Sequence, residues 1–434
     1  MTIWGEASQG GALTPAELRR VWDAETRKGK NLLHFAPKQV LDAYSELRFA
    51  RRADDDRRLI EAQEAWETKL TVFLVSVSAD LRTSIADGCF AWHLIEGRRF
   101  KNKRTFRVAR TAATYFLERV LVRQLYSLIP GRISVDRSTA VRQVATSIVD
   151  HLPKSVYRVD IKAFYESIPH DRLLLRIEAE HKIPAEFKAL VRSFLHDYSL
   201  IEGKTGVPRG TALGAALAEF YLAPLDAFLQ AENTLLHVRY VDDIVVVVGE
   251  IDPGQHEAGD DIAARLAVAL TGLGLEVNED KTKRYSIREG TWSGIIEYLG
   301  YAITPGGHGA KVLISRKRME KLHRRIDRSF EVFQDSGEEG ILLDRIKLLT
   351  GNTRLRFNKQ QAMVGIYFSN RDCTDSRQLH SLDQHLRSRL GSAAVSMRAR
   401  AMIAEMSFVR GFEDRRFHKF STTRLRQMKG AWDA

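Results

Sequence analysis

The chain has 434 residues, of which 44% are apolar and 28% are charged, and its net charge is +12. This length and apolar content allow several packed subdomains and exclude a disordered chain. Cys89 and Cys373 are too few and too far apart for a disulfide framework or a cysteine-zinc site. The N-terminus lacks the apolar core of a signal peptide, and apolar runs such as Ile244 to Val248 are too short to span a bilayer. We therefore expect a cytoplasmic protein with no membrane partner.

The positive charge is concentrated in two regions. Residues 306–434 contain 26 Lys and Arg against 14 Asp and Glu, whereas residues 1–305 contain 41 of each kind. Within this balanced part, residues 98–142 contain 12 basic and 2 acidic residues. Basic surfaces bind phosphate backbones by releasing counterions. One basic stretch is usually a solvated helix face, but two of them flanking a neutral, apolar middle favour a nucleic-acid partner.

The predicted elements change in kind along the chain. Residues 1–95 show apolar positions at helical spacing and no chemistry, so they predict a helical extension that packs or binds a partner. Residues 96–155 begin with a basic run, and a helix follows over about 112–128. Residues 156–305 alternate strands and helices, and residues 306–434 predict short basic helices.

The alternating middle of the chain is compatible with a split βαβ sheet that carries helices on one face. Its predicted elements, in chain order, are a strand at Val156 to Ile161, helices from about Pro169 and Ala212, a β-hairpin over Val238 to Val248, a helix over Asp260 to Leu273 and a strand over Ile296 to Ile303.

Two adjacent carboxylates, Asp242 and Asp243, interrupt the β-branched run of the predicted hairpin. Charges are costly in such a run unless they are paired or metal-bound, and a hairpin tip would let them hold a divalent ion. An ordinary exposed turn is the simpler interpretation of this motif alone, because Tyr-x-Asp-Asp occurs by chance in roughly one chain in twenty-five of this length.

A third carboxylate, Asp160, ends the predicted strand at Val156 to Ile161, and Tyr165 follows five residues later. A lone Asp after a strand is more often a cap or turn residue. Two metal ions about 4 Å apart, however, clamp an in-line phosphoryl transfer and need carboxylates from separate strands. Asp160 together with Asp242 and Asp243 satisfies that requirement.

At these positions the sequence resembles the palm of reverse transcriptases. The blocks that carry the resemblance are Asp160 with its strand, Val207 to Leu222, Tyr240 to Asp243, Gly274 to Thr282 and Tyr298 to Tyr301. The resemblance implies an α+β, right-hand polymerase that makes DNA on an RNA template with dNTPs and two Mg²⁺ ions, with Mn²⁺ as an alternative. It divides the chain into a helical N-terminal extension (1–95), fingers (96–155), a catalytic palm (156–305) and a basic helical thumb and C-terminal region (306–434).

The resemblance also implies roles for single residues. Asp160, Asp242, Asp243 and the Ile161 carbonyl would bind the metals. Tyr165 is at the position that excludes a ribose 2′-OH, although a packing role beside Phe164 stays open. The other implied contacts with the nucleotide come from Arg104, Arg107, Arg209, Gly210 and Lys281, and those with primer or template come from Tyr240, Leu299 and Gly300. The motif Tyr298 to Tyr301 resembles the primer-gripping turn of that family.

Lys281 would neutralise or protonate the departing pyrophosphate, or else be a surface lysine. Arg104 and Arg107 are both candidates for the triphosphate clamp, and each could instead be one of the many surface cations of this region.

Departures from the family pattern point to a subgroup. Many members have Gln at the position of Arg209 and Ser-Pro at that of Gly214-Ala215. These changes, together with the motifs Thr350 to Asn352 and Gly365 to Asn370, resemble bacterial abortive-infection and defence-associated reverse transcriptases. That resemblance implies phage defence, often with a structured non-coding RNA as template and sometimes with a second polymerase subunit or a homo-oligomer.

Two alternatives remain. An RNA-dependent RNA polymerase shares the two-metal palm, but it typically has an acid where this chain has Tyr165. A catalytically silent RNA-binding scaffold is the other, and the presence of all three aspartates argues against it. Aromatic residues among the basic C-terminal helices, such as Phe408 and Phe417, would stack bases in a scaffold, whereas core packing is their simpler role.

Overall fold

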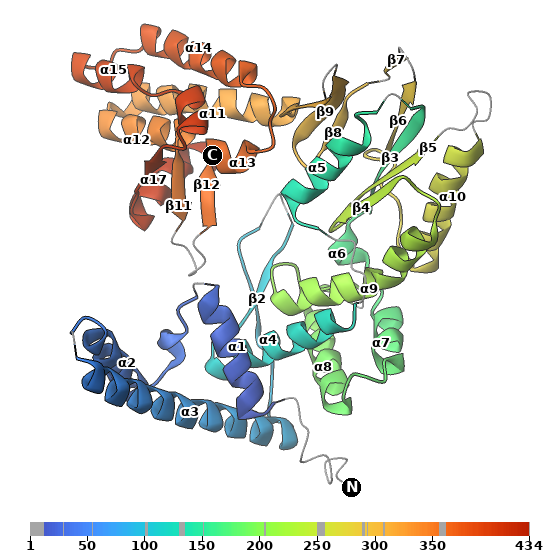
Figure 1. The fold of residues 1–434 in the computed structure, drawn as a ribbon, viewed down its shortest axis with the longest axis vertical. Helices are drawn as coiled ribbons and strands as arrows, with labels where there is room; N and C mark the ends of the chain where they lie inside the picture. The colour runs from blue at the N-terminus through green and yellow to red at the C-terminus, as the bar shows by residue number, and fades with distance from the viewer. Residues whose placement is uncertain are drawn as a thin grey trace. The chain divides into compact units, whose positions relative to one another are not determined.

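The computed structural model describes residues 13–433 apart from 29, 54, 100–102, 130–134, 151, 204, 250–256, 289–290, 293, 307–308 and 356–361 (Figure 1). The chain divides into two compact units. Unit 1 comprises Met1–Arg132, Ile161–Glu232 and Ala264–Asn278, and unit 2 comprises Ile133–Asp160, Asn233–Ala263 and Glu279–Ala434. Both units mix helix and sheet, which confirms the predicted α+β class. The division into fingers, palm and thumb stays a prediction.

Unit 1 is mainly helical. Its elements are α1 (Pro15–Arg27), η1 (Leu33–Phe35), α2 (Lys38–Ala50), α3 (Asp56–Ala86), β1 (Leu94–Glu96), β2 (Phe106–Val108), α4 (Ala112–Ser127), α6 (Phe164–Ser167), α7 (His170–Ala179), α8 (Ala185–Glu202) and α9 (Ala212–Ala231). The boundary between the units crosses α10 (Glu257–Gly272).

The N-terminal helices pack around Trp22 of α1. Its ring lies 6.2 Å from that of Trp66 on α3 and is stacked 6.3 Å from that of Phe116 on α4, and all three side chains are buried. Aromatic pairs at such separations add to the burial of apolar area. The predicted helical extension is therefore present as helices and packs on the rest of unit 1.

A buried carboxylate, Glu25, lies in the same region. It pairs with Lys28, Lys30 and Arg119 and accepts a hydrogen bond from Tyr115 at 2.8 Å. Burial alone would raise the pKa of Glu25, but these partners outweigh it and lower the pKa to about 2. Because the pKa is lower in the folded chain than in the unfolded one, ionised Glu25 stabilises the fold at neutral pH.

This stabilisation should disappear as the pH falls from the ordinary carboxyl pKa of 4.5 towards 2. We expect Glu25→Gln to reduce the free energy of unfolding by on the order of 3 kcal/mol at pH 7 and to flatten its dependence on pH between these values. Urea unfolding across pH 3 to 7 measures both effects. Glu64→Gln, on the exposed side of α3, is the matched control, and an equal response in the two variants would contradict the prediction.

Helix α9 is the most apolar element of unit 1. By length and composition it could cross a membrane, but 67% of its apolar window is buried inside the structure. Its first turn is capped by the Thr211 side chain and by Glu118 of α4, whose Oε1 accepts from the amides of Ala212 at 2.8 Å and Leu213 at 3.1 Å. A carboxylate at a helix N-terminus satisfies free amides and favours the helix dipole.

Unit 2 contains a five-stranded antiparallel sheet in the order β4-β5-β3-β6-β7. The strands are β3 (Lys154–Asp160), β4 (Leu236–Tyr240), β5 (Asp243–Gly249), β6 (Lys283–Arg288) and β7 (Thr291–Trp292). Strands β3 and β5 are almost entirely buried, as their β-branched runs require of central strands. Helix α5 (Arg137–Ser147) packs on the sheet through Val141 and Val144 (Figure 1).

The predicted single strand at Ile296 to Ile303 is instead a hairpin of β8 (Ile296–Tyr298) and β9 (Tyr301–Gly306), which β10 (Gly309–Ile314) extends. Leu299 and Gly300 both have positive φ, at 47° and 80°. Positive φ at both central residues is typical of a two-residue hairpin turn. This turn reverses the chain at a point where the alternation of apolar and polar residues alone predicts one continuous strand.

The C-terminal part of unit 2 is mostly helical, as predicted, but it also contains short strands. Its helices are α11 (Arg316–Ser336), α12 (Glu339–Thr350), α13 (Ile366–Asn370), α14 (Arg377–Ser392), α15 (Met397–Ala404), α16 (Phe408–Glu413) and α17 (Thr422–Asp433). The strands β11 (Asn352–Leu355), β12 (Ala362–Gly365) and β13 (Phe417–His418) form a three-stranded sheet that sequence reasoning missed.

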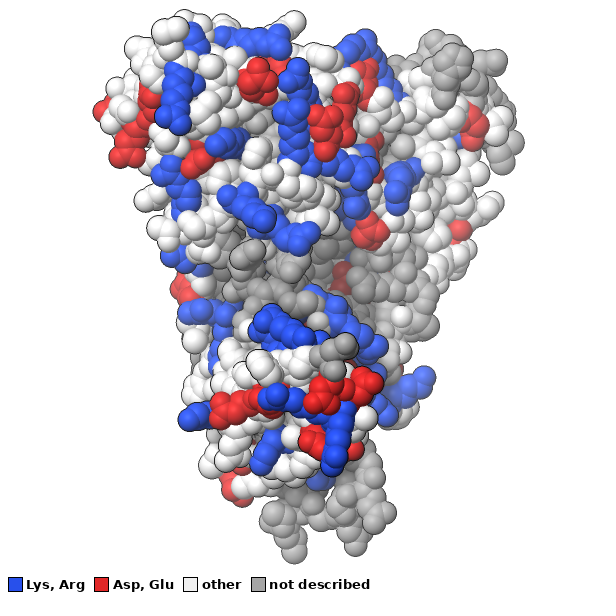
Figure 2. All heavy atoms as spheres, turned by 60° about the vertical axis from the view of Figure 1, so that its left-hand side comes forward, with Lys and Arg blue, Asp and Glu red and all other residues white. Residues whose placement is uncertain are grey.

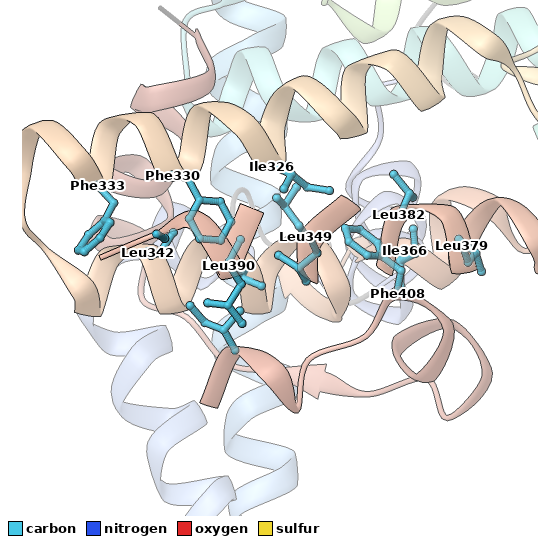
Figure 3. Close-up of a cluster of buried hydrophobic side chains, with 14 of the residues drawn as sticks. Ile326, Phe330, Phe333, Leu342, Leu349, Ile366, Leu379, Leu382, Leu390 and Phe408 are labelled. Atoms are coloured by element: carbon cyan, nitrogen blue, oxygen red, sulfur yellow. The ribbon is translucent and has the colours of Figure 1, made fainter. Parts of the chain in front are cut away.

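One buried cluster holds these C-terminal helices together. Figure 3 shows Phe330 of α11, Leu349 of α12, Leu382 of α14 and Phe408 of α16 converging on it. Phe408 is fully buried, so the core role is confirmed for this aromatic residue. On the outside, Lys and Arg side chains are spread over the C-terminal helices (Figure 2).

Candidate active site

The β4–β5 hairpin has the predicted acids at its turn. Tyr240 and Asp243 are paired across the ladder, and Val241 and Asp242 form the turn between them. Val241 has a φ of 60°, which is unusual for a β-branched residue and costs on the order of 1–3 kcal/mol. The fully buried Arg239 donates from Nη1 to the Val241 carbonyl at 3.0 Å and so supports this strained turn.

Asp160 and Asp243 are brought directly opposite each other by the register of β3 and β5. Asp160 is 6% exposed and Asp243 is 8% exposed, while Asp242 on the turn is partly exposed. Side chains on directly opposed residues of an antiparallel pair lie on the same face of the sheet. The structure therefore brings together the carboxylates that the sequence pattern assigned to separate strands.

Each of the two buried carboxylates is paired with a cation of unit 2. Lys281 Nζ lies 3.2 Å and 3.0 Å from the two oxygens of Asp160. Arg158 donates to both oxygens of Asp243, at 2.9 Å and 2.8 Å. Burial raises the pKa of Asp243, and the bond from Arg158 opposes this shift. Sequence reasoning missed Arg158, although it lies two residues before Asp160 and so on the same face of β3.

The donor chemistry at this edge of the sheet fits a hard divalent cation, because carboxylate oxygens are its preferred ligands. Among the residues that the structure describes, no group of three or more His, Cys, Asp or Glu has a metal-binding arrangement. The side chain of Lys281 is 57% exposed and is free to move away from Asp160, whereas Arg158 is largely buried and engages both oxygens of Asp243. Asp160, Asp242 and Asp243 stay the predicted metal ligands, and Asp243 is also held by Arg158.

The predicted nucleotide-binding residues Arg104 and Arg209 line one pocket of about 310 Å³ in unit 1. Arg104 donates to Glu96 at 3.0 Å and 2.8 Å and pairs with Glu202 at 2.5 Å. Two carboxylates thus hold one guanidinium at the pocket wall. Arg107, in contrast, is exposed on β2 next to the buried Phe106 and does not line this pocket. Of the two candidates for the triphosphate clamp, Arg104 lines this pocket and Arg107 does not.

Tyr165 and Arg209 are in direct contact. The Arg209 guanidinium lies 4.5 Å from the centre of the Tyr165 ring and donates to Glu166 at 3.1 Å and 3.2 Å. Lys103 also donates to Glu166, at 3.0 Å. Tyr165 packs beside Phe164 as well, at 5.4 Å, so its packing role and a role at the nucleotide are compatible. Glu166 is a site residue that the sequence analysis missed, and only its position beside Tyr165 could have indicated it.

Gly210 lies in the loop before α9, and Gly214 lies in the first turn of that helix. Gly210 has a φ of 98°, and a Cβ there would lie 2.9 Å from the Phe106 carbonyl oxygen. A Cβ on Gly214 would lie 2.4 Å from the carbonyl oxygen of Pro208. The Phe106 amide donates to the Arg209 carbonyl at 2.7 Å, which joins this loop to β2. The departure from Ser at Gly214 is therefore required by the backbone of this loop.

The remaining predicted residues lie in defined positions. Ile161 is buried and forms an isolated bridge with Val277 in unit 1. In unit 2, Leu299 and Gly300 form the β8–β9 turn, as the resemblance implied. Arg137 Nε donates to the Leu299 carbonyl at 3.0 Å, and Arg318 Nη1 donates to the Gly300 carbonyl at 3.2 Å.

The same two arginines flank the ring of Tyr301, at 4.6 Å and 5.6 Å from its centre, and both donate to the Ser369 carbonyl. This support of the turn comes from outside the predicted palm and was missed.

Part of the chain is similar to known proteins. Residues 104–303 match the family model described as reverse transcriptase (RNA-dependent DNA polymerase). A curated relative, the "Uncharacterized 91 kDa protein in cob intron" of Schizosaccharomyces pombe, is 24% identical over 219 residues, which are 36% of this chain and 26% of the relative. The chain thus spans about a quarter of that relative's length.

Solved structures similar to this chain include three telomerase structures. Apo telomerase from Candida tropicalis, truncated from its C-terminal domain, has a TM-score of 0.36 at 14% identity and covers 59% of this chain and 69% of that chain. Telomerase from Candida tropicalis with a TWJ fragment of telomeric RNA has a TM-score of 0.37 at 13% identity, covering 80% and 73%. The corresponding complex from Candida albicans has a TM-score of 0.37 at 13% identity, covering 82% and 76%.

Residues 104–303, just under half of the chain, thus resemble a reverse-transcriptase polymerase domain. Within this region the antiparallel sheet of unit 2 places Asp160 and Asp243 opposite each other.

Proposed function

We propose that this protein is an RNA-directed DNA polymerase that acts in bacterial antiphage defence, in the cytoplasm, on a structured non-coding RNA template. The observation that carries the polymerase proposal is the cross-strand pair Asp160–Asp243, with Asp242 on the adjoining turn, inside the region that matches reverse transcriptases. The proposal includes dNTPs as substrates, DNA as product and two Mg²⁺ ions as cofactors, with Mn²⁺ able to replace them.

The proposed roles follow from where the side chains lie in each unit. In unit 2, Asp160, Asp242 and Asp243 would hold the ions, and Arg158 would keep Asp243 ionised and oriented. Bound divalent ions supply activation of the attacking 3′-oxygen and neutralisation of charge on the leaving oxygen. Lys281 donates to Asp160 at 3.0 Å. During the reaction its ammonium group would leave Asp160 and neutralise or protonate the departing pyrophosphate. In unit 1, Arg104 would contact the triphosphate.

The defence role is supported by two features of the chain. Arg209 replaces the Gln of many reverse transcriptases and pairs with Glu166, and Gly214 replaces Ser because its surroundings leave no room for a Cβ. The motif from Gly365 to Asn370 reaches the β8–β9 turn through the Ser369 carbonyl. A second polymerase subunit or a homo-oligomer belongs to the same proposal.

The test is to purify the protein from a bacterial host under RNase inhibition and to sequence the nucleic acid that copurifies. Magnesium is then supplied with labelled dNTPs or, separately, with rNTPs. We expect a discrete RNA and incorporation of dNTPs that depends on that RNA. Incorporation of rNTPs alone would assign the protein to the RNA polymerases, and retention of RNA without any synthesis would favour the scaffold. The defence role is tested by phage plating on hosts that carry the wild-type gene or an Asp242→Asn variant.

A separate prediction concerns the choice of sugar. We expect Tyr165→Ala to increase the use of rNTPs relative to dNTPs by ~10- to 100-fold, because removal of the ring opens space for a 2′-OH. Tyr165→Phe keeps the ring and its contact with Arg209, and it should retain the wild-type preference. Single-nucleotide incorporation kinetics with paired dNTP and rNTP measure the ratio. An unchanged ratio in Tyr165→Ala would rule out a sugar-gate role for this residue.

A further inference from the structure

A pocket of about 390 Å³ opens among the C-terminal elements of unit 2. It is lined by residues of α11, α12, α13, α17, β11 and β12. Leu349 and Ile366, which Figure 3 shows in the buried cluster, form part of its apolar wall. Pockets that bind small molecules commonly have 300–1,000 Å³ and walls of this kind.

The charged residues that line this pocket all carry the same sign. They are Arg318, Lys321, Arg325 and Lys429, and none of the described residues that line it is Asp or Glu. The described lining therefore carries charge of one sign only, which favours a positive potential in the cavity. The pocket is therefore complementary to an anion that also carries an apolar part.

An aromatic ring and a buried amide add further features. Trp432 lines the pocket, and its Nε1 donates to the Arg325 carbonyl and to Ser329 Oγ, both at 3.1 Å, so its ring is fixed in place. Asn370 is 3% exposed, and its Nδ2 donates to the Ile366 carbonyl at 2.8 Å. That bond orients the amide, and Asn370 Oδ1 then accepts no hydrogen bond from any residue that the structure describes.

A buried acceptor without a donor costs free energy, so Asn370 Oδ1 indicates a ligand with an N–H group. Phosphate matches the cations, and a flat ring matches the apolar wall and Trp432. Nucleotides combine all three properties, since every common nucleobase is flat and carries at least one N–H on its edge.

We propose that this pocket binds a nucleotide, with its phosphate at Lys321 and Lys429 and an N–H of its base at Asn370 Oδ1. The site does not use the catalytic aspartates and needs no metal. Arg318 lines the pocket and also donates to the Gly300 carbonyl, so an occupant would contact the side chain that supports the β8–β9 turn. The same chemistry is offered by a free mononucleotide and by one unstacked nucleotide of an RNA strand.

The experiment measures binding of AMP and of an eight-residue oligoadenylate to the full chain by calorimetry. Asp242→Asn protein in EDTA is used, so that metal-dependent binding at the polymerase site does not contribute. We expect at least one probe to bind and the double variant Lys321→Glu/Lys429→Glu to weaken that binding by about tenfold or more. The matched control is Lys317→Glu/Lys419→Glu, which changes the net charge equally at exposed residues outside the pocket.

Binding of AMP would identify a free nucleotide as the occupant, and binding of the oligonucleotide alone would identify an RNA strand. Asn370→Leu should abolish the preference for AMP over ribose 5-phosphate. The proposal is overturned if neither probe binds or if the pocket variant and the control variant respond equally. Where AMP binds, it is also overturned if ribose 5-phosphate binds wild-type protein as tightly as AMP. None of these readouts requires DNA synthesis, so the result is separate from that of the proposed polymerase function.

Discussion

Replacing Asp242 with asparagine is expected to reduce nucleotide incorporation by on the order of 10³-fold or more. Asn keeps the size of the side chain and one oxygen but removes the negative charge that a hard cation requires. Asp242 lies on the hairpin turn and is partly exposed, so the free energy of unfolding should change by less than about 0.5 kcal/mol. Primer extension with Mg²⁺ and labelled nucleotides measures the loss.

The control for this variant is Asp87→Asn, which removes an exposed carboxylate from the end of α3 in unit 1. It should retain wild-type incorporation. RNA binding should be equal in the two variants, because neither removes a basic residue. If Asp242→Asn kept a tenth or more of the wild-type rate, the assignment of this carboxylate as a metal ligand would be wrong.

The sequence predicted the elements that depend on local pattern. The β-branched run around Asp242 and Asp243 predicted a hairpin with the acids at its turn, and the observed β4–β5 turn lies where the acids interrupt that run. The turn at Leu299 and Gly300 was likewise indicated by its motif. Both features are set by neighbours within a few residues, which is the range over which alternation and turn chemistry act.

The partners of these residues could not be predicted in the same way. Arg158 reaches Asp243 because the register pairs Asp160 with Asp243, and that register joins segments more than eighty residues apart in the chain. Arg318 reaches Gly300 only after α11 packs beside the β8–β9 hairpin. Tertiary packing decides which distant segments pair. The periodicity of one segment therefore does not predict its partner.

The strands β11 and β13 illustrate the same limit within the C-terminal region. They pair in parallel although about sixty residues separate them, and each has only a few residues. Asn352 joins them from its side chain, since its Nδ2 donates to the Gly411 carbonyl at 2.8 Å and to the Arg416 carbonyl at 3.2 Å. Segments this short have no periodicity of their own, so the sequence predicted only helices there.

The contact between Arg158 and Asp243 allows the structural and catalytic roles of Asp243 to be separated. Breaking a buried ion pair by removal of one partner typically costs 3–5 kcal/mol, because the other charge is left buried and uncompensated. We therefore expect Arg158→Met to reduce the free energy of unfolding by about 3–5 kcal/mol at pH 8. The double variant Arg158→Met/Asp243→Asn should recover much of this loss, since no charge is then left in the sheet.

The dependence on pH gives an independent check of the same variants. Burial already raises the pKa of Asp243, and loss of Arg158 leaves only the weaker effect of Lys281 to oppose it, so the folded chain binds a proton more tightly than the unfolded chain does. The destabilisation by Arg158→Met is then fully present above the folded-state pKa and shrinks as the pH falls through it. Urea unfolding of the single and double variants at several pH values measures the difference between their free energies of unfolding. Since the two variants differ only at residue 243, the contributions of all other titrating groups cancel in this difference.

Activity of the same set distinguishes the two roles. If Asp243 binds a metal ion directly, the double variant will be stable but as inactive as Asp160→Asn. If Asp243 acts mainly by holding Arg158 and the turn, the double variant will regain part of the activity that Arg158→Met loses. Equal stability of Arg158→Met and the wild type would contradict the buried pair itself, because a carboxylate that is 8% exposed cannot lose a two-bond guanidinium partner without cost.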